Sequence, residues 1–170
     1  MPRLSRLLTL VALGALIITS GARAARTSAE MSTPTAGAGD ATLILIEHAD
    51  HVSEIDLGER GASVGDMLVW GPDPLYDDAN VNDSGATTQG SCIAFSANSD
   101  CLAAETIVFP DGSTLEFQGI ERAGGVPSVR TIVGGSGRYL GAVGTMTASP
   151  SPDLELWTKT IEFAAPPDRP

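Results

Sequence analysis

The sequence of 170 residues contains few basic and few aromatic residues. Ten Lys and Arg residues stand against 21 Asp and Glu residues, so the formal net charge is −11. Such a chain offers no basic patch to phosphate groups, and we therefore expect neither nucleic acid nor an anionic membrane surface as a partner. Aromatic residues make up only 5% of the chain. This argues against a glycosidase, whose sugar site would need aromatic platforms beside its pair of carboxylates.

Cysteine is equally scarce, with only Cys92 and Cys101. Their spacing fits neither a zinc site nor a thioredoxin-type motif, and no neighbouring base is evident that would activate a nucleophilic thiolate. In an oxidising compartment the pair is instead expected to form a disulfide. Eight residues separate the two cysteines, as expected for facing positions on a hairpin, and closing such a loop stabilises a fold by about 2–3 kcal/mol.

The apolar run near the N-terminus is too short to span a bilayer. Residues 7–19 follow Arg3 and Arg6, and Ala22-Arg23-Ala24 has the small-x-small pattern of a cleavage site. This arrangement predicts a signal peptide over residues 1–24 and a secreted or extracytoplasmic protein. An uncleaved N-terminal anchor is the alternative. Without this segment, seven basic residues remain against 21 acidic ones, a formal charge of −14.

The remaining chain divides into one domain with a segment on each side. Residues 25–40 are small and polar, which predicts a disordered leader. Residues 41–164 are expected to form a single β-barrel domain, a length sufficient for a hydrophobic core. The Pro-rich residues 165–170 are predicted to be a flexible tail.

Strand signals recur through the predicted domain, and no segment has the periodicity of an amphipathic helix. Eight antiparallel strands can close around side chains or one small ligand, so we predict an all-β, eight-stranded antiparallel barrel. An immunoglobulin-like sandwich is disfavoured because Trp70 precedes both cysteines. Residues 53–65 and 77–85 are predicted as connections, and 71–74 as a break, because proline lacks an N–H donor. The predicted strands are residues 42–48, 66–70, 87–96, 102–109, 114–121, 129–133, 142–149 and 155–163.

The most specific motif is the glycine-rich stretch Ile132-Val133-Gly134-Gly135-Ser136-Gly137-Arg138-Tyr139-Leu140-Gly141-Ala142-Val143-Gly144. Glycine tolerates positive φ and close backbone approach, so a tight and crowded hairpin is predicted. A phosphate-binding loop fits less well, because no Lys-Ser/Thr follows the glycines and no helix begins there.

With this stretch and five shorter motifs, residues 47–163 resemble the allene oxide cyclase and dirigent-like barrel family. The resemblance implies an eight-stranded, calycin-type barrel, usually a trimer, around an apolar cavity. It also implies that an unstable or flexible substrate is held there in one reactive conformer. The shorter motifs, in the family's order, are Val64-Gly65-Asp66, Leu75-Tyr76, Gly90-Ser91-Cys92, Phe109-Pro110-Asp111-Gly112 and Gln118-Gly119.

The resemblance also assigns residues to the cavity. Glu47 matches a cavity glutamate that helps to delocalise substrate charge, and Cys92 matches a cavity cysteine. Trp70 and Cys101 match positions of aromatic walls. Ala49 and Pro72, in contrast, stand where the cyclases have asparagines that bind a water molecule, and their Ser-Pro pair has no clear counterpart. True allene oxide cyclase activity is therefore not expected.

Residue type and strand alternation extend this set of candidates. Glu47 lies in an otherwise apolar strand, so it is either a cavity acid, base or charge stabiliser, or a solvated residue at the rim. Glu105 shares a face with Cys101, and two inward glutamates would suit acid–base chemistry. Arg130 could reach inward to Glu47 or to an anionic substrate group, with an outward position as the alternative. Tyr76 is predicted to line the cavity mouth.

No metal or cofactor is expected. His48 and His51 are three residues apart, so on a strand they point to opposite faces, and we interpret them as surface residues. Ile44 and Ile46 would form an apolar stripe outside the barrel, which favours a homo-oligomer, either a trimer or a dimer.

Three functions remain open. The first is a cofactor-independent cyclase or isomerase that acts on a small, largely apolar natural-product precursor. The second is a dirigent-type protein that directs stereochemistry without turnover of its own. The third is a barrel that only binds an apolar ligand.

Overall fold

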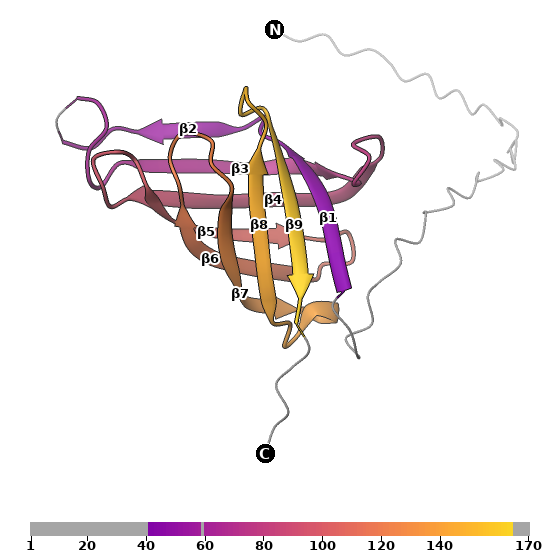
Figure 1. The fold of residues 1–170 in the computed structure, drawn as a ribbon. Helices are drawn as coiled ribbons and strands as arrows, with labels where there is room; N and C mark the ends of the chain where they lie inside the picture. Colours follow the sequence, from indigo (N-terminus) through magenta and orange to yellow (C-terminus); the bar gives the residue numbers. More distant parts are fainter. Residues whose placement is uncertain (1–40, 59, 165–170) are drawn as a thin grey trace, which may run out of the picture. The chain divides into compact units, whose positions relative to one another are not determined.

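The computed structural model describes residues 41–58 and 60–164, and the predicted signal peptide, leader and tail lie outside them. The described residues form one antiparallel sheet in the order β1-β9-β8-β7-β6-β5-β4-β3-β2 (Figure 1). An additional β1–β3 pairing closes eight of the strands into a barrel, as predicted. The strands are β1 (Ala41–His48), β2 (Val52–Ile55), β3 (Met67–Tyr76), β4 (Asp83–Ala94), β5 (Cys101–Val108), β6 (Thr114–Glu121), β7 (Ser128–Ser136), β8 (Gly144–Pro150) and β9 (Leu156–Phe163).

The barrel interior contains two apolar clusters. Side chains of a strand alternate between its two faces, and on β5 the residues Cys101, Ala103, Glu105 and Ile107 are all buried while their neighbours face outward. Glu105 thus separates the two clusters along this strand. The larger one contains Leu45, Leu75, Ala86, Ile107, Phe109, Leu115, Phe117, Ile132, Tyr139, Met146, Ala148 and Ile161, and the smaller one Trp70, Cys92, Ala94, Cys101 and Ala103.

Three predictions for residues 52–85 are wrong. Strand β3 continues through Gly71-Pro72-Asp73-Pro74, because a register shift between Trp70 and Asp73 accommodates the residues that cannot donate to the ladder. Strand β2, which the polar sequence of residues 53–65 concealed, pairs only with β3 outside the closed barrel. Strand β4 begins at Asp83, inside the segment predicted as a loop.

The glycine-rich stretch is crowded as predicted, but it is not a tight hairpin. Strand β7 extends through Gly135, and a short 3₁₀ turn, η1 (Gly137–Tyr139), leads toward β8. A Cβ atom on Gly135 would lie 2.5 Å from the carbonyl oxygen of Tyr139. The glycine therefore allows the buried Tyr139 ring to close this end of the barrel, between Phe109 and Phe163.

Among residues 41–58 and 60–164, no helix has the length and apolar character needed to cross a membrane.

Candidate functional site

Five charged side chains form a chain of ion pairs inside the barrel. Lys159 Nζ lies 2.9 Å from Glu47 Oε2 and also donates to Glu105 Oε1. Arg130 donates to Glu105 Oε2 through Nη1 and to Glu121 Oε2 through Nη2. The charges therefore alternate in the order Glu47, Lys159, Glu105, Arg130, Glu121, and only the middle carboxylate contacts both cations.

Strand alternation explains why these charged groups point inward. Lys159 occupies β9 two residues from the buried Ile161. Arg130 lies two residues before the buried Ile132 on β7. Glu121 lies four residues after the buried Phe117 on β6, on the same inward face of the strand. A residue two positions from a core residue shares its face of the sheet. The charged layer thus lies next to the larger apolar cluster, at one level of the barrel.

The middle carboxylate is the most firmly held. Glu105 is 3% exposed and accepts a third hydrogen bond, of 2.6 Å, from Thr88 Oγ1 on the neighbouring strand. Burial alone would raise the pKa of Glu105, but Lys159 and Arg130 outweigh it and hold the pKa below its ordinary value. Glu105 is therefore a permanent anion and organises the two cations around it.

The two terminal carboxyls behave differently. Burial raises the pKa of Glu47, and Lys159 only partly opposes this effect because the nearby Glu105 acts in the same direction as burial. Burial likewise raises the pKa of Glu121 against the opposing charge of Arg130. Each of them contacts one cation, whereas Glu105 contacts two. The layer therefore contains two carboxyl groups that take up a proton more readily than an ordinary glutamate.

Both terminal carboxyls border one cavity. The cavity has a volume of about 230 Å³, and its polar side is formed by Glu47, Glu121, Arg130 and Lys159. This combination of an apolar hollow with a few converging polar groups is typical of a small-molecule site. The remaining lining residues are Ala49, Val52, Glu54, Leu68, Trp70, Leu154 and Trp157.

Two tryptophans provide the large flat walls of this cavity. Trp70 lies on β3 and is 7% exposed, and the Arg130 guanidinium carbon lies 5.6 Å from its ring centroid. Gly90 makes room for the ring, since a Cβ atom at this position would lie 2.4 Å from Trp70 Cζ2. Trp157 lines the cavity from β9. Flat walls of this kind favour a planar, apolar ligand.

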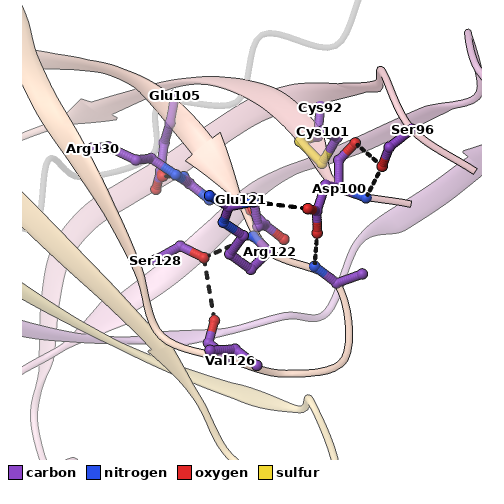
Figure 2. Close-up of a disulfide and its surroundings, with 11 residues drawn as sticks. Cys92, Ser96, Asp100, Cys101, Glu105, Glu121, Arg122, Val126, Ser128 and Arg130 are labelled. Carbon is purple, nitrogen blue, oxygen red and sulfur yellow. Dashed lines mark hydrogen bonds and ion pairs between the residues drawn. A yellow bond between two sulfur atoms is a disulfide. The ribbon is translucent and has the colours of Figure 1, made fainter. Parts of the chain in front are cut away.

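The disulfide is present as predicted, between Cys92 on β4 and Cys101 on β5. The two cysteines face inward but are diagonal neighbours, because Cys92 pairs with Ala103 and Cys101 with Ala94. Figure 2 shows the disulfide together with Glu105, Arg130 and Glu121. The two sulfur-bearing residues line a second hollow, of about 310 Å³, which Glu121 also borders.

The predicted site residues are only partly brought together. The structure places Glu47, Trp70 and Arg130 on one cavity. Glu105 faces inward as predicted, but it lies in the ion-pair layer and does not line that cavity. Arg130 is also inward, and its carboxylate partners are Glu105 and Glu121, whereas Glu47 pairs with Lys159 of the adjacent strand β9. Cys92 and Cys101 border the neighbouring hollow.

Tyr76 is not among the cavity-lining residues. The register shift in β3 places Leu75 in the core, so Tyr76 points to the outer face and stacks on His48 with ring centroids 4.2 Å apart. His48 Nε2 lies 2.8 Å from Asn80 Oδ1, whereas His51 Nδ1 lies 2.9 Å from Oδ1 of the buried Asp73. The two histidines thus have separate partners. In the described residues, no three His, Cys, Asp or Glu side chains are grouped as metal ligands.

Sequence reasoning missed Lys159, Glu121 and Thr88. Lys159 is the only lysine of the chain, and it alternates with Trp157 and Ile161 along one strand. Glu121 lies four residues after the buried Phe117 on β6, on the same face of the strand. In each strand a charged residue stands at a position where the alternation of the strand would place an inward, apolar residue. This pattern is the signal that could have identified Lys159 and Glu121.

No protein-family model and no curated protein sequence match the chain. Solved structures do match it. A pyocyanin demethylase is 24% identical over 73% of this chain and 100% of its own, with a TM-score of 0.63. A pterocarpan synthase dirigent protein is 17% identical over 74% and 93%, with a TM-score of 0.56. The Diels-Alderase AbmU from Streptomyces koyangensis is 21% identical over 78% and 72%, with a TM-score of 0.54.

At these identities the likeness shows the fold alone. The barrel of this chain is the one found in dirigent proteins and in cyclases of the Diels-Alderase type.

Proposed function

We propose that the protein binds a small, largely apolar molecule in the 230 Å³ cavity and converts it, without a cofactor, as a cyclase or isomerase. One observation carries this proposal. The larger apolar cluster fills one end of the barrel interior, and the layer of paired charges next to it borders a cavity of about 230 Å³. Since a purely structural barrel would fill its interior with side chains, the hollow and its polar side indicate a ligand.

The chemistry would depend on confinement. A flexible precursor held between Trp70 and Trp157 loses most of its alternative conformers, and such positioning can lower a barrier by several kcal/mol. The apolar walls also exclude water, which protects a reactive intermediate. Glu47 supplies a polar contact at the cavity floor, as an acid, a base or a stabiliser of developing charge.

The two tryptophans of the chain both line the cavity, so intrinsic fluorescence reports on it directly. We expect N-phenyl-1-naphthylamine, a neutral apolar probe, to quench tryptophan emission saturably and to gain fluorescence itself. Ala49→Phe should abolish this binding by filling the cavity. Ala104→Phe, on the outward face of β5, serves as the matched control and should bind as the wild type does. Equal binding by both variants, or none by the wild type, would contradict the proposal.

A dirigent-type protein is the second candidate, because solved dirigent proteins share the fold. It would impose stereochemistry on intermediates generated by an oxidase and would show no turnover alone. A simple ligand-binding barrel would release its ligand unchanged. The carboxyl groups on the cavity favour the first function over both, since steering or storage of an apolar ligand does not require buried acids. Glu47→Gln should therefore slow conversion by a cyclase and leave plain binding almost unchanged.

We also propose that the protein is exported and forms homo-oligomers. The disulfide is compatible with an oxidising compartment. The stripe predicted from Ile44 and Ile46 is interrupted, since Ile46 is 8% exposed between β3 and β9. The outer face of the barrel instead carries exposed Ile93, Leu102 and Ile120, which are neighbours on β4, β5 and β6. Native mass spectrometry of the exported protein would report processing, subunit number and any retained ligand together.

A further inference from the structure

The two ends of the ion-pair chain face the same hollow. Glu47 borders the cavity from β1 and Glu121 borders it from β6. Lys159, Glu105 and Arg130 connect the two through successive ion pairs. Each end contacts one cation only. A molecule in the cavity therefore contacts two carboxyl groups that belong to one connected set of charges.

The number of charges in this set is odd. Three carboxylates and two cations leave one uncompensated negative charge inside the barrel, which is costly in an apolar interior. A single proton on one carboxyl removes it. Glu105 is not the recipient, because it is bound by both cations and by Thr88. The proton therefore belongs to one of the two ends, which leaves the other end ionised.

The surroundings assign the proton to Glu47. This carboxyl faces Lys159 of β9, which it shares with Glu105 of β5, and it also feels the buried Asp73 of β3. Glu121 faces Arg130 of β7 and, farther away, Lys159 and Glu105. Arg130 gives a separate nitrogen to each of its two carboxylates, whereas the single Nζ of Lys159 is divided between Glu47 and Glu105. The carboxylate form of Glu121 is therefore the better supported of the two ends. Glu54 of β2 also lines the cavity but is exposed.

We propose that Glu121 is the base and Glu47 the hydrogen-bond donor of a proton-shift reaction on a planar carbonyl compound bound in the cavity. This inference rests on the proposed function. The neutral Glu47 carboxyl donates a hydrogen bond to the carbonyl oxygen. The Glu121 carboxylate takes a proton from the adjacent carbon, so the C–H bond breaks, an O–H bond forms and the electron pair moves into the enol or enolate. Glu121 then returns the proton to the same or to a conjugated carbon, and both groups regain their starting state.

The lining of the cavity sets the class of ligand. Two tryptophan rings form its walls, and its polar side carries two carboxyl groups and two cations. A planar apolar body fits flat aromatic walls, and a carbonyl oxygen can accept a hydrogen bond from a protonated carboxyl. The substrate class is therefore a ketone or enone with a planar apolar body that fits between the tryptophan walls.

The shared proton can be tested without any ligand. Protein labelled with ¹³C at glutamate Cδ should show one carboxyl that remains protonated at neutral pH in the wild type. This signal should disappear in Glu47→Gln and persist in Glu116→Gln, which alters an exposed glutamate on the outward face of β6. The assignment of the proton to Glu47 is overturned if every glutamate carboxyl titrates in the same pH range as the exposed ones. It is also overturned if the signal disappears in Glu121→Gln alone.

The reaction can be tested with 2-tetralone, a planar aromatic ketone, through the exchange of its α-protons in D₂O followed by ¹H NMR. We expect Glu121→Gln to slow the exchange about 100-fold or more, the usual contribution of a positioned base. Glu121→Asp should restore part of the rate, and Glu116→Gln should leave it unchanged. Glu47→Gln keeps an N–H donor, so its loss of rate should be smaller, and the rate should no longer fall as the pH rises through the raised pKa of Glu47.

Quenching of the tryptophans by 2-tetralone separates the two proposals. If 2-tetralone quenches their emission but exchanges no faster with the wild type than with folded Glu121→Gln, the proton-shift reaction is overturned and the binding function stands. If N-phenyl-1-naphthylamine quenches them and 2-tetralone does not, the proton-shift proposal is overturned and the binding function stands. Near-ultraviolet circular dichroism of each variant shows whether a loss of rate reflects a loss of fold.

Discussion

Lys159 and Glu47 lie on adjacent antiparallel strands, diagonally across the β1–β9 pair, with Nζ and Oε2 2.9 Å apart inside the barrel. Lys159 also contacts Glu105, so one cation serves two buried carboxylates. Burial would lower the pKa of Lys159, but these two glutamates outweigh it and raise the pKa above its ordinary value. The only lysine of the chain is therefore a permanent cation at the centre of the proposed site.

Lys159→Met should destabilise the protein by about 3–5 kcal/mol at neutral pH, because it leaves buried carboxylates without their cation. Urea unfolding measures the change. Arg122→Met is a suitable control, since the ion pair of Arg122 with Asp100 is largely exposed on the arginine side and should contribute no more than about 1 kcal/mol. A loss below that value for Lys159→Met would mean that water reaches the charged layer.

Glu47→Gln should become progressively more stable relative to the wild type as the pH rises. Because burial raises the pKa of Glu47, the folded state binds this proton more tightly than the unfolded state does. Its contribution to stability is complete below the ordinary pKa and is lost as the pH rises through the higher pKa of the folded state. Urea unfolding of both proteins from about pH 4 to about pH 8 tests this. A difference that stays constant or shrinks would contradict the raised pKa.

Thr88→Val should lower the stability by about 1.5–3 kcal/mol, the range for a hydrogen bond to a charged group. The substitution keeps the shape of the side chain but removes the hydroxyl that donates to Glu105. Thr87→Val, one residue earlier and on the opposite face of β4, should be nearly neutral. Equal effects of the two substitutions would show that the hydroxyl is unimportant for Glu105.

Reduction of the Cys92–Cys101 disulfide should cost about 2–3 kcal/mol, since the loop that it closes is short. Thermal unfolding with and without dithiothreitol measures the loss. A Cys92→Ala, Cys101→Ala double variant should reproduce the stability of the reduced protein and should not respond to dithiothreitol. A remaining response in that variant would point to an effect of the reductant elsewhere.

Gly90→Ala should disturb the cavity, because the new Cβ atom would lie within contact distance of the Trp70 ring and of the Ala104 carbonyl oxygen. Overpacking of this kind typically costs about 1–3 kcal/mol, and the displaced ring should weaken binding of N-phenyl-1-naphthylamine. Emission recorded in a Trp157→Phe background isolates Trp70. Ser91→Ala, the next residue on β4, should leave the emission unchanged, and an unchanged Gly90→Ala spectrum would show that the ring does not depend on this glycine.

Several features of the fold follow from local sequence. The strand signals within single segments predict the all-β barrel, and strand alternation makes Glu47 and Glu105 candidates for the interior, with a solvated rim position left open for Glu47. The close spacing of Cys92 and Cys101 on one predicted hairpin is sufficient for the disulfide. The boundaries that failed lie where prolines and polar residues conceal strands, as in Gly71-Pro72-Asp73-Pro74. There the pairing of neighbouring strands overrides the local preference.

By itself, then, the sequence determined the fold class and the disulfide, because these depend on residues that are near one another in the chain. Only the tertiary structure decided which inward charges meet. Glu105 and Lys159 are 54 residues apart, and the register of the strands between them and the closure of the barrel bring them into contact. The pairing of Glu121 with Arg130 is local to the adjacent strands β6 and β7, but only the closed barrel places Glu121 and Glu47 on one cavity.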